Sequence, residues 1–384
     1  MADSTVYSVM VLGGGMAGAI SAETLARRGQ RVLLLEQYEP GHQRGSSHGD
    51  GRIIRYAYAE PEYVAMAHLA YPLWEALGRR AGEPLIRRTG GWDCDEAGSA
   101  QLAQTEANFI AYGVPYERLD AADSNRRFPH FFLPEGSQAL YHPDGGVVFA
   151  DKAVLAFWRL AQAAGAETQT GERIVNLDVV GNLVHLRGAS GAVYRGERLV
   201  VATGSWSRQV LRQVGLDVPL TALQVQVAHF PVLGTLSHGP EAMPYFIDYH
   251  GEHLFYGLPQ LEVPGVKVGW HSAYRELADP YSEQPIDLDN LALTQRFVGE
   301  RLPHLGLEPL RIITCRYTMT PDEHFVLDRH PTLPQIVIGT GFSGHGFKFA
   351  PALGEILADL VLDQPPQLDL RRFALGRFDS TPAD

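Results

Sequence analysis

A glycine-rich turn between a predicted strand and a predicted helix is the strongest constraint on how this chain folds. Residues 6–12 form a short, mostly apolar run, which is typical of a buried parallel strand. Gly13, Gly15 and Gly18 follow in the spacing Gly-x-Gly-x-x-Gly, and residues 16–28 have helical periodicity. The first glycine permits the sharp bend, the second lets a pyrophosphate approach the backbone, and the third lets helix and strand pack closely. The turn predicts a dinucleotide site, with a plain glycine turn as the alternative.

Two neighbouring features narrow the choice of dinucleotide. The helix begins at Met16 and Ala17, where backbone N–H groups are free to face a ligand. Glu36 ends a second apolar run, at residues 31–36, and an acid there accepts a ribose hydroxyl and favours NAD or FAD over NADP. The sequence offers no second motif for a nicotinamide cofactor, but a later strand ends at Gly204 in Val-Val-Ala-Thr-Gly, a common second contact in flavoproteins. FAD is therefore the expected cofactor.

Composition excludes several other classes of protein. The chain has 384 residues, enough for two domains, and a net charge of −12, which argues against nucleic acid or an anionic membrane as the main partner. Residues 6–12 have no basic segment before them, so we expect a strand rather than a signal peptide, and no apolar run is long enough for a membrane helix. Two cysteines, Cys94 and Cys315, do not make a disulfide framework, so we expect a cytoplasmic protein.

A loop at residues 42–55 gathers positive charge in this acidic chain. Arg44, His48, Arg52 and Arg55 lie there against a single acid. Such a cluster either attracts and binds an anionic ligand or belongs to a solvated loop whose cations pair with carboxylates elsewhere in the protein.

Three other segments carry reactive side chains. Lys267 and His271 would share one face if their segment is a strand, although an exposed strand face is the alternative. Lys348 lies between the glycine-rich residues 341–346 and a predicted helix, which suits either a polar ligand or a plain turn. Cys315 is a lone cysteine, and such residues are usually small buried apolar groups. We find no spacing of His, Cys, Asp or Glu that suits a metal, so none is predicted.

Six stretches together resemble the monomeric sarcosine oxidase and N-methyltryptophan oxidase family of FAD-dependent amine oxidases, in the D-amino acid oxidase superfamily. They follow the family order and span nearly the whole chain. The most specific are Cys-Arg-Tyr-Thr-Met-Thr-Pro-Asp-Glu-His-Phe and Gly-Phe-Ser-Gly-His-Gly-Phe-Lys-Phe. The stretches are residues 13–18, 45–58, 256–259, 267–271, 315–325 and 341–349.

The resemblance implies a role for each reactive side chain. Cys315 would carry the flavin through a thioether to its 8α carbon, and Lys267 would activate O₂. Arg55 and Lys348 would hold the substrate carboxylate, with Ile247 as a wall of the substrate cavity. Two cations suit a carboxylate, and a buried ammonium suits the charge that develops as O₂ accepts an electron. Further catalytic-site residues would be Arg52, His48, Tyr256, His271 and Tyr317, and the cofactor would be held by Gly13, Gly15, Met16, Ala17, Gly18, Glu36, Arg44, Ser46, Val175, Gly204, Gly344, Gly346, Phe347 and Lys348.

We expect an α/β fold with two discontinuous domains, because nucleotide-type elements lie at the start, middle and end of the chain. An FAD-binding domain of the two-dinucleotide-binding-fold (Rossmann-like) type would take residues 1–85, 146–220 and 323–384. A catalytic domain on a mixed β-sheet would take residues 86–145 and 221–322.

The resemblance further implies a monomer that oxidises a secondary, N-methylated amino acid to formaldehyde and a primary amine, with O₂ reduced to H₂O₂. The chain departs from the family pattern at Ser47, where a histidine is frequent, and at Gly51, where a threonine is frequent. Residues 86–130 and 235–255 match the family poorly. Three alternatives therefore stay open: a flavin oxidase of cyclic imino acids, glycated amino acids or a pathway intermediate; a flavin dehydrogenase that passes electrons to a partner; and a flavin-binding module without turnover.

Overall fold

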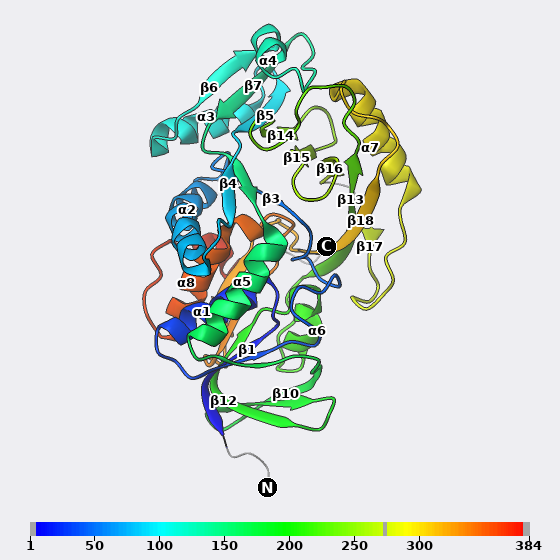
Figure 1. Cartoon of the computed structure of the whole chain (residues 1–384). Helices are drawn as coiled ribbons and strands as arrows, with labels where there is room; N and C mark the ends of the chain where they lie inside the picture. The colour runs from blue at the N-terminus through cyan, green and yellow to red at the C-terminus, as the bar shows by residue number, and fades with distance from the viewer. Residues whose placement is uncertain (1–4, 272–274, 379–384) are drawn as a thin grey trace.

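The computed structural model describes residues 5–271 and 275–378, and within these ranges the strands form three sheets (Figure 1). The first sheet has the strand order β10-β11-β12-β1-β2-β9, and β20 continues it on β12 with β19 on β20. Its centre is parallel, because β1 pairs in parallel with both β12 and β2. Its strands are β1 (Val6–Leu12), β2 (Val32–Leu35), β9 (Glu167–Gln169), β10 (Ile174–Val180), β11 (Leu183–Gly188), β12 (Val193–Val201), β19 (Val326–Arg329) and β20 (Ile336–Thr340).

Helices α1 (Met16–Arg27), α5 (Ala150–Ala163) and α8 (Ala350–Val361) pack together beside this sheet (Figure 1). Helix α1 is buried on all sides along most of its length, because it contacts β1, α5 and α8 together. This is why its sequence is almost entirely small and apolar. Helix α2 (Pro61–Ala81) contacts α8 in turn. The predicted βαβ start and C-terminal helix are therefore confirmed.

The second sheet is mixed and runs in the order β17-β13-β16-β15-β14-β5-β7-β6, with β18 paired to β13. Strand β14 pairs in parallel with β5, whereas β13 pairs antiparallel with β16 and β18. Its strands are β5 (Gly91–Glu96), β6 (Glu117–Asp120), β7 (Ser137–His142), β13 (Thr221–Phe230), β14 (Tyr245–Asp248), β15 (Phe255–Leu258), β16 (Val266–Trp270), β17 (Arg275–Glu276) and β18 (Arg311–Met319). The predicted α/β class with a mixed second sheet is confirmed.

A small third sheet, β3-β8-β4, lies between the two large ones in Figure 1. Its strands are β3 (Arg52–Ile54), β4 (Ile86–Arg88) and β8 (Gly146–Val148). Strands of the first large sheet fall within 1–85, 146–220 and 323–384, and those of the second fall within 86–145 and 221–322. The domain division at these residues stays a prediction, and residues 1–4, 272–274 and 379–384 lie outside the described part of the chain.

The described residues contain four further α-helices, α3 (Ala100–Tyr112), α4 (Ala121–Arg127), α6 (Ser207–Arg212) and α7 (Leu288–Arg301), and the short 3-10 helices Gly204–Trp206, Phe347–Phe349, Arg371–Phe373 and Leu375–Phe378. Helix α7 lies within residues 221–322, for which the sequence predicts a domain on a mixed β-sheet. Its buried side mixes Asn290 and Thr294 with Phe297 and Val298, which weakens the apolar periodicity. The side chain of Asp287 caps it by accepting the backbone N–H groups of residues 289 and 290.

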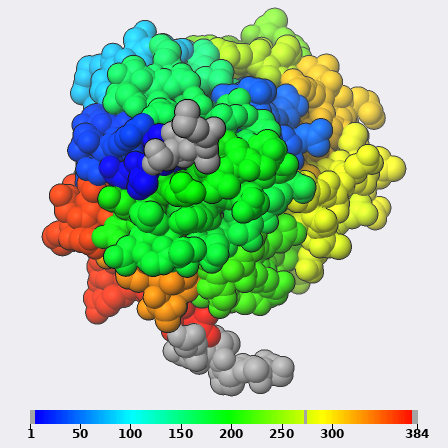
Figure 2. All heavy atoms as spheres, turned by 90° about the horizontal axis from the view of Figure 1, so that it is seen from below, coloured from blue at the N-terminus to red at the C-terminus, as the bar shows by residue number. Residues whose placement is uncertain are grey.

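Segments that are far apart in the sequence share one surface. Seen from below, N-terminal blue, central green and C-terminal orange-to-red atoms lie side by side (Figure 2). In the described ranges, no helix has the length and apolar character needed to span a bilayer.

Candidate functional site

The glycine turn after β1 has the geometry that its spacing predicts. Gly13 has φ of +100°, a conformation that favours glycine, and a Cβ on Gly18 would lie 1.7 Å from the carbonyl oxygen of Gly13. A Cβ on Gly15 would meet only the Ser47 Oγ, at 3.1 Å. Gly13 is therefore required by its backbone conformation and Gly18 by packing. Gly15 instead leaves open space over the N-terminus of α1.

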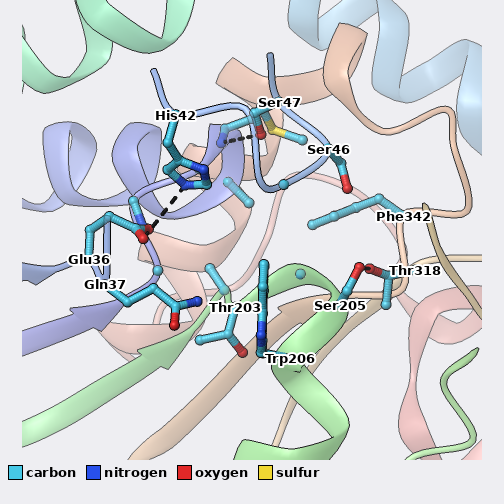
Figure 3. Close-up of a pocket in the computed structure, with 18 of the residues that line it drawn as sticks. Glu36, Gln37, His42, Ser46, Ser47, Thr203, Ser205, Trp206, Thr318 and Phe342 are labelled. Atoms are coloured by element: carbon cyan, nitrogen blue, oxygen red, sulfur yellow. Dashed lines mark hydrogen bonds and ion pairs between the residues drawn. The ribbon is translucent and has the colours of Figure 1, made fainter. Parts of the chain in front are cut away.

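A pocket extends from this turn across the ends of β1, β2 and β12 (Figure 3). In Figure 3, Glu36 and Gln37 lie on one side of it, and Ser46 and Phe342 lie on the other. The lining combines glycine backbone and short polar side chains with apolar and aromatic side chains, and the glycine turn at the N-terminus of α1 suits a long ligand bearing phosphates. The predicted residues that line it are Gly13, Gly15, Met16, Ala17, Glu36, Ser46, Gly204, Gly344, Gly346 and Phe347.

Glu36 lies where the second strand ends, as predicted. Its Oε2 accepts the Gly14 N–H at 2.6 Å, and its Oε1 accepts the Tyr38 N–H at 2.9 Å. Burial raises the pKa of Glu36, although these backbone N–H groups oppose the rise. The ring of His42 lies 3.6 Å away, and burial lowers the pKa of His42 to about 4, so the imidazole is neutral at pH 7. The acid is therefore oriented by the backbone.

A second cavity, of about 510 Å³, adjoins the pocket. The two linings share His48, Arg52, Tyr317, Gly344 and Phe347. A Cβ on Gly344 would lie 2.2 Å from the Tyr317 ring, so glycine at this position leaves room for that ring between the pocket and the second cavity. A planar group that reaches from the pocket to this boundary would face the second cavity. The described residues thus fit FAD, with its ring at the junction.

Lys267 lies in β16 on the cavity side of the junction, and its Nζ donates to the Gly51 carbonyl oxygen at 2.9 Å. Burial and the charge of nearby Arg52 together lower the pKa of Lys267 to about 8, whereas Asp50 opposes the shift. The ammonium form still predominates at pH 7. Burial, with Arg52 and Lys267, lowers the pKa of His48 to about 3, so this neighbour is neutral.

The two departures from the family pattern have distinct consequences. The Ser47 Oγ accepts the Met16 N–H at 3.0 Å, so it caps the N-terminus of α1 rather than contacting Lys267. A Cβ on Gly51 would lie 2.5 Å from Leu261 and 2.9 Å from Leu258, so these leucines fill the space that a side chain would occupy.

Arg55 and Lys348 flank the ring of Tyr58 inside the second cavity. The Arg55 guanidinium lies 4.3 Å from the ring centroid, and the Lys348 Nζ donates to the Tyr58 hydroxyl at 2.8 Å. Burial, and then the charge of Arg55, lowers the pKa of Lys348 well below its usual value. Two mutually repelling basic groups in one buried cavity form a site for an anion.

Tyr256, Tyr317 and His271 line the same cavity. The Tyr256 and Tyr317 hydroxyls are hydrogen-bonded to each other, and the His271 ring lies 5.6 Å from that of Tyr317. Burial, with the charges of Lys348 and Arg55, lowers the pKa of His271 to about 4. The predicted shared face is present, because Lys267 and His271 both line the cavity and Tyr256 packs on the glycine between them.

Cys315 lies in β18 and lines the cavity beside the junction. It is a buried free thiol, and burial raises its pKa although Arg52 and Lys267 oppose the rise. Ile247 in β14 is 4% exposed, lines the same cavity and belongs to an apolar cluster with Leu258.

Five predicted cofactor residues lie outside the pocket lining: Gly18, Arg44, Val175, Lys348 and Cys315, the last of which lines the second cavity. Val175 is 43% exposed, and its neighbour Ile174 lines the pocket instead; an irregularity in the pairing of β10 with β11 falls between residues 174 and 176 and leaves Val175 facing outward. Arg44 is exposed and lies 5.5 Å over the Tyr38 ring. Gly18 acts through packing, and Lys348 belongs to the second cavity.

Several lining residues were not predicted. Trp206 and Tyr281 line the pocket, and Tyr249 and Gln101 line the second cavity. Trp206 could have been found, because it lies two residues after Gly204, in the short 3-10 helix Gly204–Trp206 that follows β12. The others come from segments without a recognisable pattern: Gln101 lies in α3, and Tyr249 and Tyr281 lie in loops after β14 and β17.

The structure also brings together Cys94, Asp248 and His250, with potential ligand atoms within 4.8 Å of one another. Their wide spacing in the sequence hid this group. The His250 Nδ1 lies 2.7 Å from an Asp248 oxygen, and Arg301 lies 3.5 Å from the other oxygen. An arginine at this position competes with a cation, so we assign no metal here.

Comparisons with known proteins agree with this geometry. The profile of the family described as FAD dependent oxidoreductase matches residues 8–360. The human peroxisomal sarcosine oxidase is 38% identical, covering 99% of this chain and 98% of that protein. The monomeric sarcosine oxidase of Bacillus sp. (strain B-0618) is 33% identical, covering 97% of each chain. The solved structure of NikD, an amino acid oxidase essential for nikkomycin biosynthesis, superposes with a TM-score of 0.86 at 27% identity, covering 97% of this chain and 98% of that one.

The dinucleotide turn, the pocket that suits FAD and the adjoining cavity thus occur in a chain that matches this profile over most of its length. We conclude that the protein belongs to the family of FAD-dependent oxidoreductases that includes the sarcosine oxidases.

Proposed function

We propose that this protein oxidises a secondary amino acid of the N-methyl type, releasing formaldehyde and the primary amine while O₂ becomes H₂O₂. The observation that carries the proposal is the placement of Arg55, Lys348 and Lys267 in one cavity that adjoins the cofactor pocket. FAD, when bound, supplies the two-electron oxidation of the amine and passes the electrons to O₂. The names of the sarcosine oxidases among its relatives support the same substrate class.

In this proposal Arg55 and Lys348 bind the substrate carboxylate from two sides. The carboxylate favours the ammonium form of Lys348 and so offsets the effect of Arg55 on its pKa. His271, Tyr256 and Tyr317 border the amine. Because the His271 imidazole is neutral at pH 7, it adds no positive charge and does not repel a cationic amine.

Lys267 acts on the oxygen side of the reaction. Its ammonium is buried and held at Gly51, which keeps a positive charge at the junction between the two cavities. A fixed cation in a low-dielectric site stabilises negative charge that develops on O₂. Arg52 and His48 complete this part of the site, since the Arg52 guanidinium donates to the carbonyl oxygens of Ser46, His48 and Gly51.

We also propose that Cys315 carries the flavin covalently. Its thiol lines the cavity together with the shared residues, close enough to Arg52 and Lys267 for their charges to oppose the rise in its pKa that burial causes. Cys315→Ala should yield flavin that stays in solution when the protein is precipitated with acid, whereas wild-type flavin should precipitate with the protein. Cys94→Ala is the matched control, because Cys94 is also a buried thiol but lies outside both linings. Acid-insoluble flavin in Cys315→Ala would reject this attachment site.

Substrate identity is tested by anaerobic absorbance titration of the holoenzyme. The panel contains sarcosine, N-methyl-tryptophan, N-methyl-alanine, proline, pipecolate and a fructosyl amino acid. We expect an N-methyl amino acid to bleach the flavin rapidly, and air to restore the colour with formation of H₂O₂. Bleaching that air does not reverse would instead favour a dehydrogenase. The same preparation, measured by light scattering, tests the proposed monomer.

A further inference from the structure

A buried network holds Arg55 from behind the substrate cavity. Asp93, in β5, is 1% exposed, and its Oδ1 lies 3.2 Å from the Arg55 Nη1. Its Oδ2 accepts a hydrogen bond from the Tyr245 hydroxyl at 2.9 Å. The His142 Nε2 lies 2.7 Å from the same hydroxyl. Because Tyr245 directs its proton to Asp93, His142 donates to the Tyr245 oxygen. None of the three supporting residues lines the cavity.

Strand pairing places these residues together. In the parallel pair of β5 and β14, Gly91 is opposite Tyr245, and in the antiparallel pair of β5 and β7 it is opposite His142. A Cβ on Gly91 would lie 2.3 Å from the Tyr245 ring, and one on Gly145 would lie 2.7 Å from it. The two glycines therefore form a slot that accepts the ring. This slot fixes the hydroxyl that holds Asp93.

The network engages one end of the guanidinium and leaves the other end for a ligand. The Arg55 Nη1 contacts Asp93, donates to the Tyr249 hydroxyl at 2.8 Å and donates to the Ala57 carbonyl oxygen. None of the hydrogen bonds to Asp93, Tyr249 and Ala57 comes from its Nη2 or Nε, and the Arg55 side chain is also hydrogen-bonded to the Tyr58 hydroxyl in the cavity. Because Arg55 lines the cavity, its Nη2 and Nε are the pair that can bind a carboxylate in bidentate fashion.

The carboxylate of Asp93 carries a charge opposite to that of Arg55. Burial raises the pKa of Asp93 to about 6, whereas Arg55 and the Tyr245 hydroxyl lower it, so the carboxylate form predominates at pH 7. Burial lowers the pKa of His142 to about 3, with a further contribution from Arg55, so His142 is neutral. Asp93 is thus the anion that pairs with Arg55 before any substrate arrives.

We propose that Asp93, supported by Tyr245 and His142, is a positioning residue that holds Arg55 with its free edge toward the substrate carboxylate. The inference rests on the proposed function, because it takes Arg55 as the carboxylate-binding residue. It assigns a binding role to a network that does not touch the substrate. A preorganised arginine loses less conformational freedom when the ligand binds.

The test uses butyrate as a probe on the holoenzyme. Butyrate has the shape of sarcosine with a methylene in place of the amine, so it binds without being oxidised. Isothermal titration calorimetry would give its Kd in wild type, Asp93→Ala and Asp93→Asn. We expect Asp93→Ala to raise the Kd about 10-fold or more, whereas Asp93→Asn stays within about 3-fold, because the amide oxygen still accepts from Arg55. With the accepted amine substrate, Asp93→Ala should raise KM and leave kcat within about 2-fold.

Asp248→Ala is the matched control. Asp248 is a buried aspartate in the neighbouring strand with its own arginine, Arg301, but it lies outside the cavity lining. Its loss should leave the butyrate Kd unchanged. An unchanged Kd in Asp93→Ala, an equal rise in Asp248→Ala, or an Asn variant as weak as the Ala variant would each overturn the inference. If Asp93→Ala does not fold, Tyr245→Phe decides: it should raise the Kd several-fold, and an unchanged Kd would overturn the inference.

A further variant separates this inference from the proposed function. If wild type does not bind butyrate, or if Arg55→Met binds it as tightly as wild type, the carboxylate role of Arg55 fails. If Arg55→Met loses binding while Asp93→Ala retains it, only the positioning role of Asp93 fails.

Discussion

The cofactor pocket is built around a glycine turn, whereas the adjoining cavity is bounded mainly by aromatic and charged side chains. In that turn three glycines have separate tasks. The cavity depends on side chains from several strands and loops that meet only when the second sheet has formed. We therefore expect FAD binding in the pocket to be sensitive mainly to substitutions that add a Cβ beside the backbone. Substrate binding and catalysis in the cavity should be sensitive mainly to substitutions that remove a charge or a hydrogen bond.

The largest effect should come from the glycine turn. Gly18→Ala would force a Cβ to within 1.7 Å of the Gly13 carbonyl oxygen, so we expect a loss of about 3 kcal/mol in the free energy of unfolding, together with loss of bound FAD. Denaturant titration and the flavin content of the purified protein measure both effects.

Gly15→Ala is the matched variant, because a Cβ there meets only the Ser47 Oγ at 3.1 Å and the backbone is extended. The apoprotein should keep its free energy of unfolding to within about 0.5 kcal/mol, while FAD binds more weakly. Equal destabilisation by the two variants would show that the glycines do not have separate roles.

Removal of the buried ammonium should have the next largest effect. Lys267→Met should slow reoxidation of the substrate-reduced enzyme by O₂ about 100-fold or more, while anaerobic reduction by substrate changes little. Lys152→Met is the control, because Lys152 is a half-exposed lysine outside both linings. Stopped-flow absorbance separates the two steps, and equal slowing of both would contradict the assigned role.

The same lysine predicts a pH dependence in wild type. The pKa of Lys267 is lowered to about 8, so the ammonium is present below this pH and is lost as the pH rises through it. The rate of reoxidation should therefore fall as the pH rises through about 8. Lys267→Met should lack this step, and a step that persists in the variant would assign it to another group.

The smallest effect is expected at Val175, on the rim of the cofactor region. Val175→Ala should change the free energy of unfolding by less than about 0.5 kcal/mol and leave FAD affinity unchanged, because the side chain is 43% exposed and outside the lining. Ile174→Ala, one residue away on the lining face, should weaken FAD binding. Flavin fluorescence titration of the two apoproteins compares them, and the reverse order would place the contact at Val175.

The amount of the site that could be predicted differs between the two regions. The positions of the glycines, Glu36 and Gly204 follow from local spacing, because a strand, a tight turn and a helix are neighbours in the sequence. The shared face of Lys267 and His271 also follows from strand periodicity. Asp93 could not be assigned, because its only sequence signal is an acid within the strand Trp-Asp-Cys, and its partners come from other strands.

The sequence by itself determined the dinucleotide turn, the α/β class and, through its resemblance to a known family, the set of reactive side chains. These depend on contacts between residues that are close along the chain, where periodicity and glycine geometry act directly. Only the tertiary structure decided how Arg55 is held, which face of β10 meets the pocket and what fills the space beside Gly51. Each of these depends on the register between distant strands or on packing between loops, which no local pattern specifies.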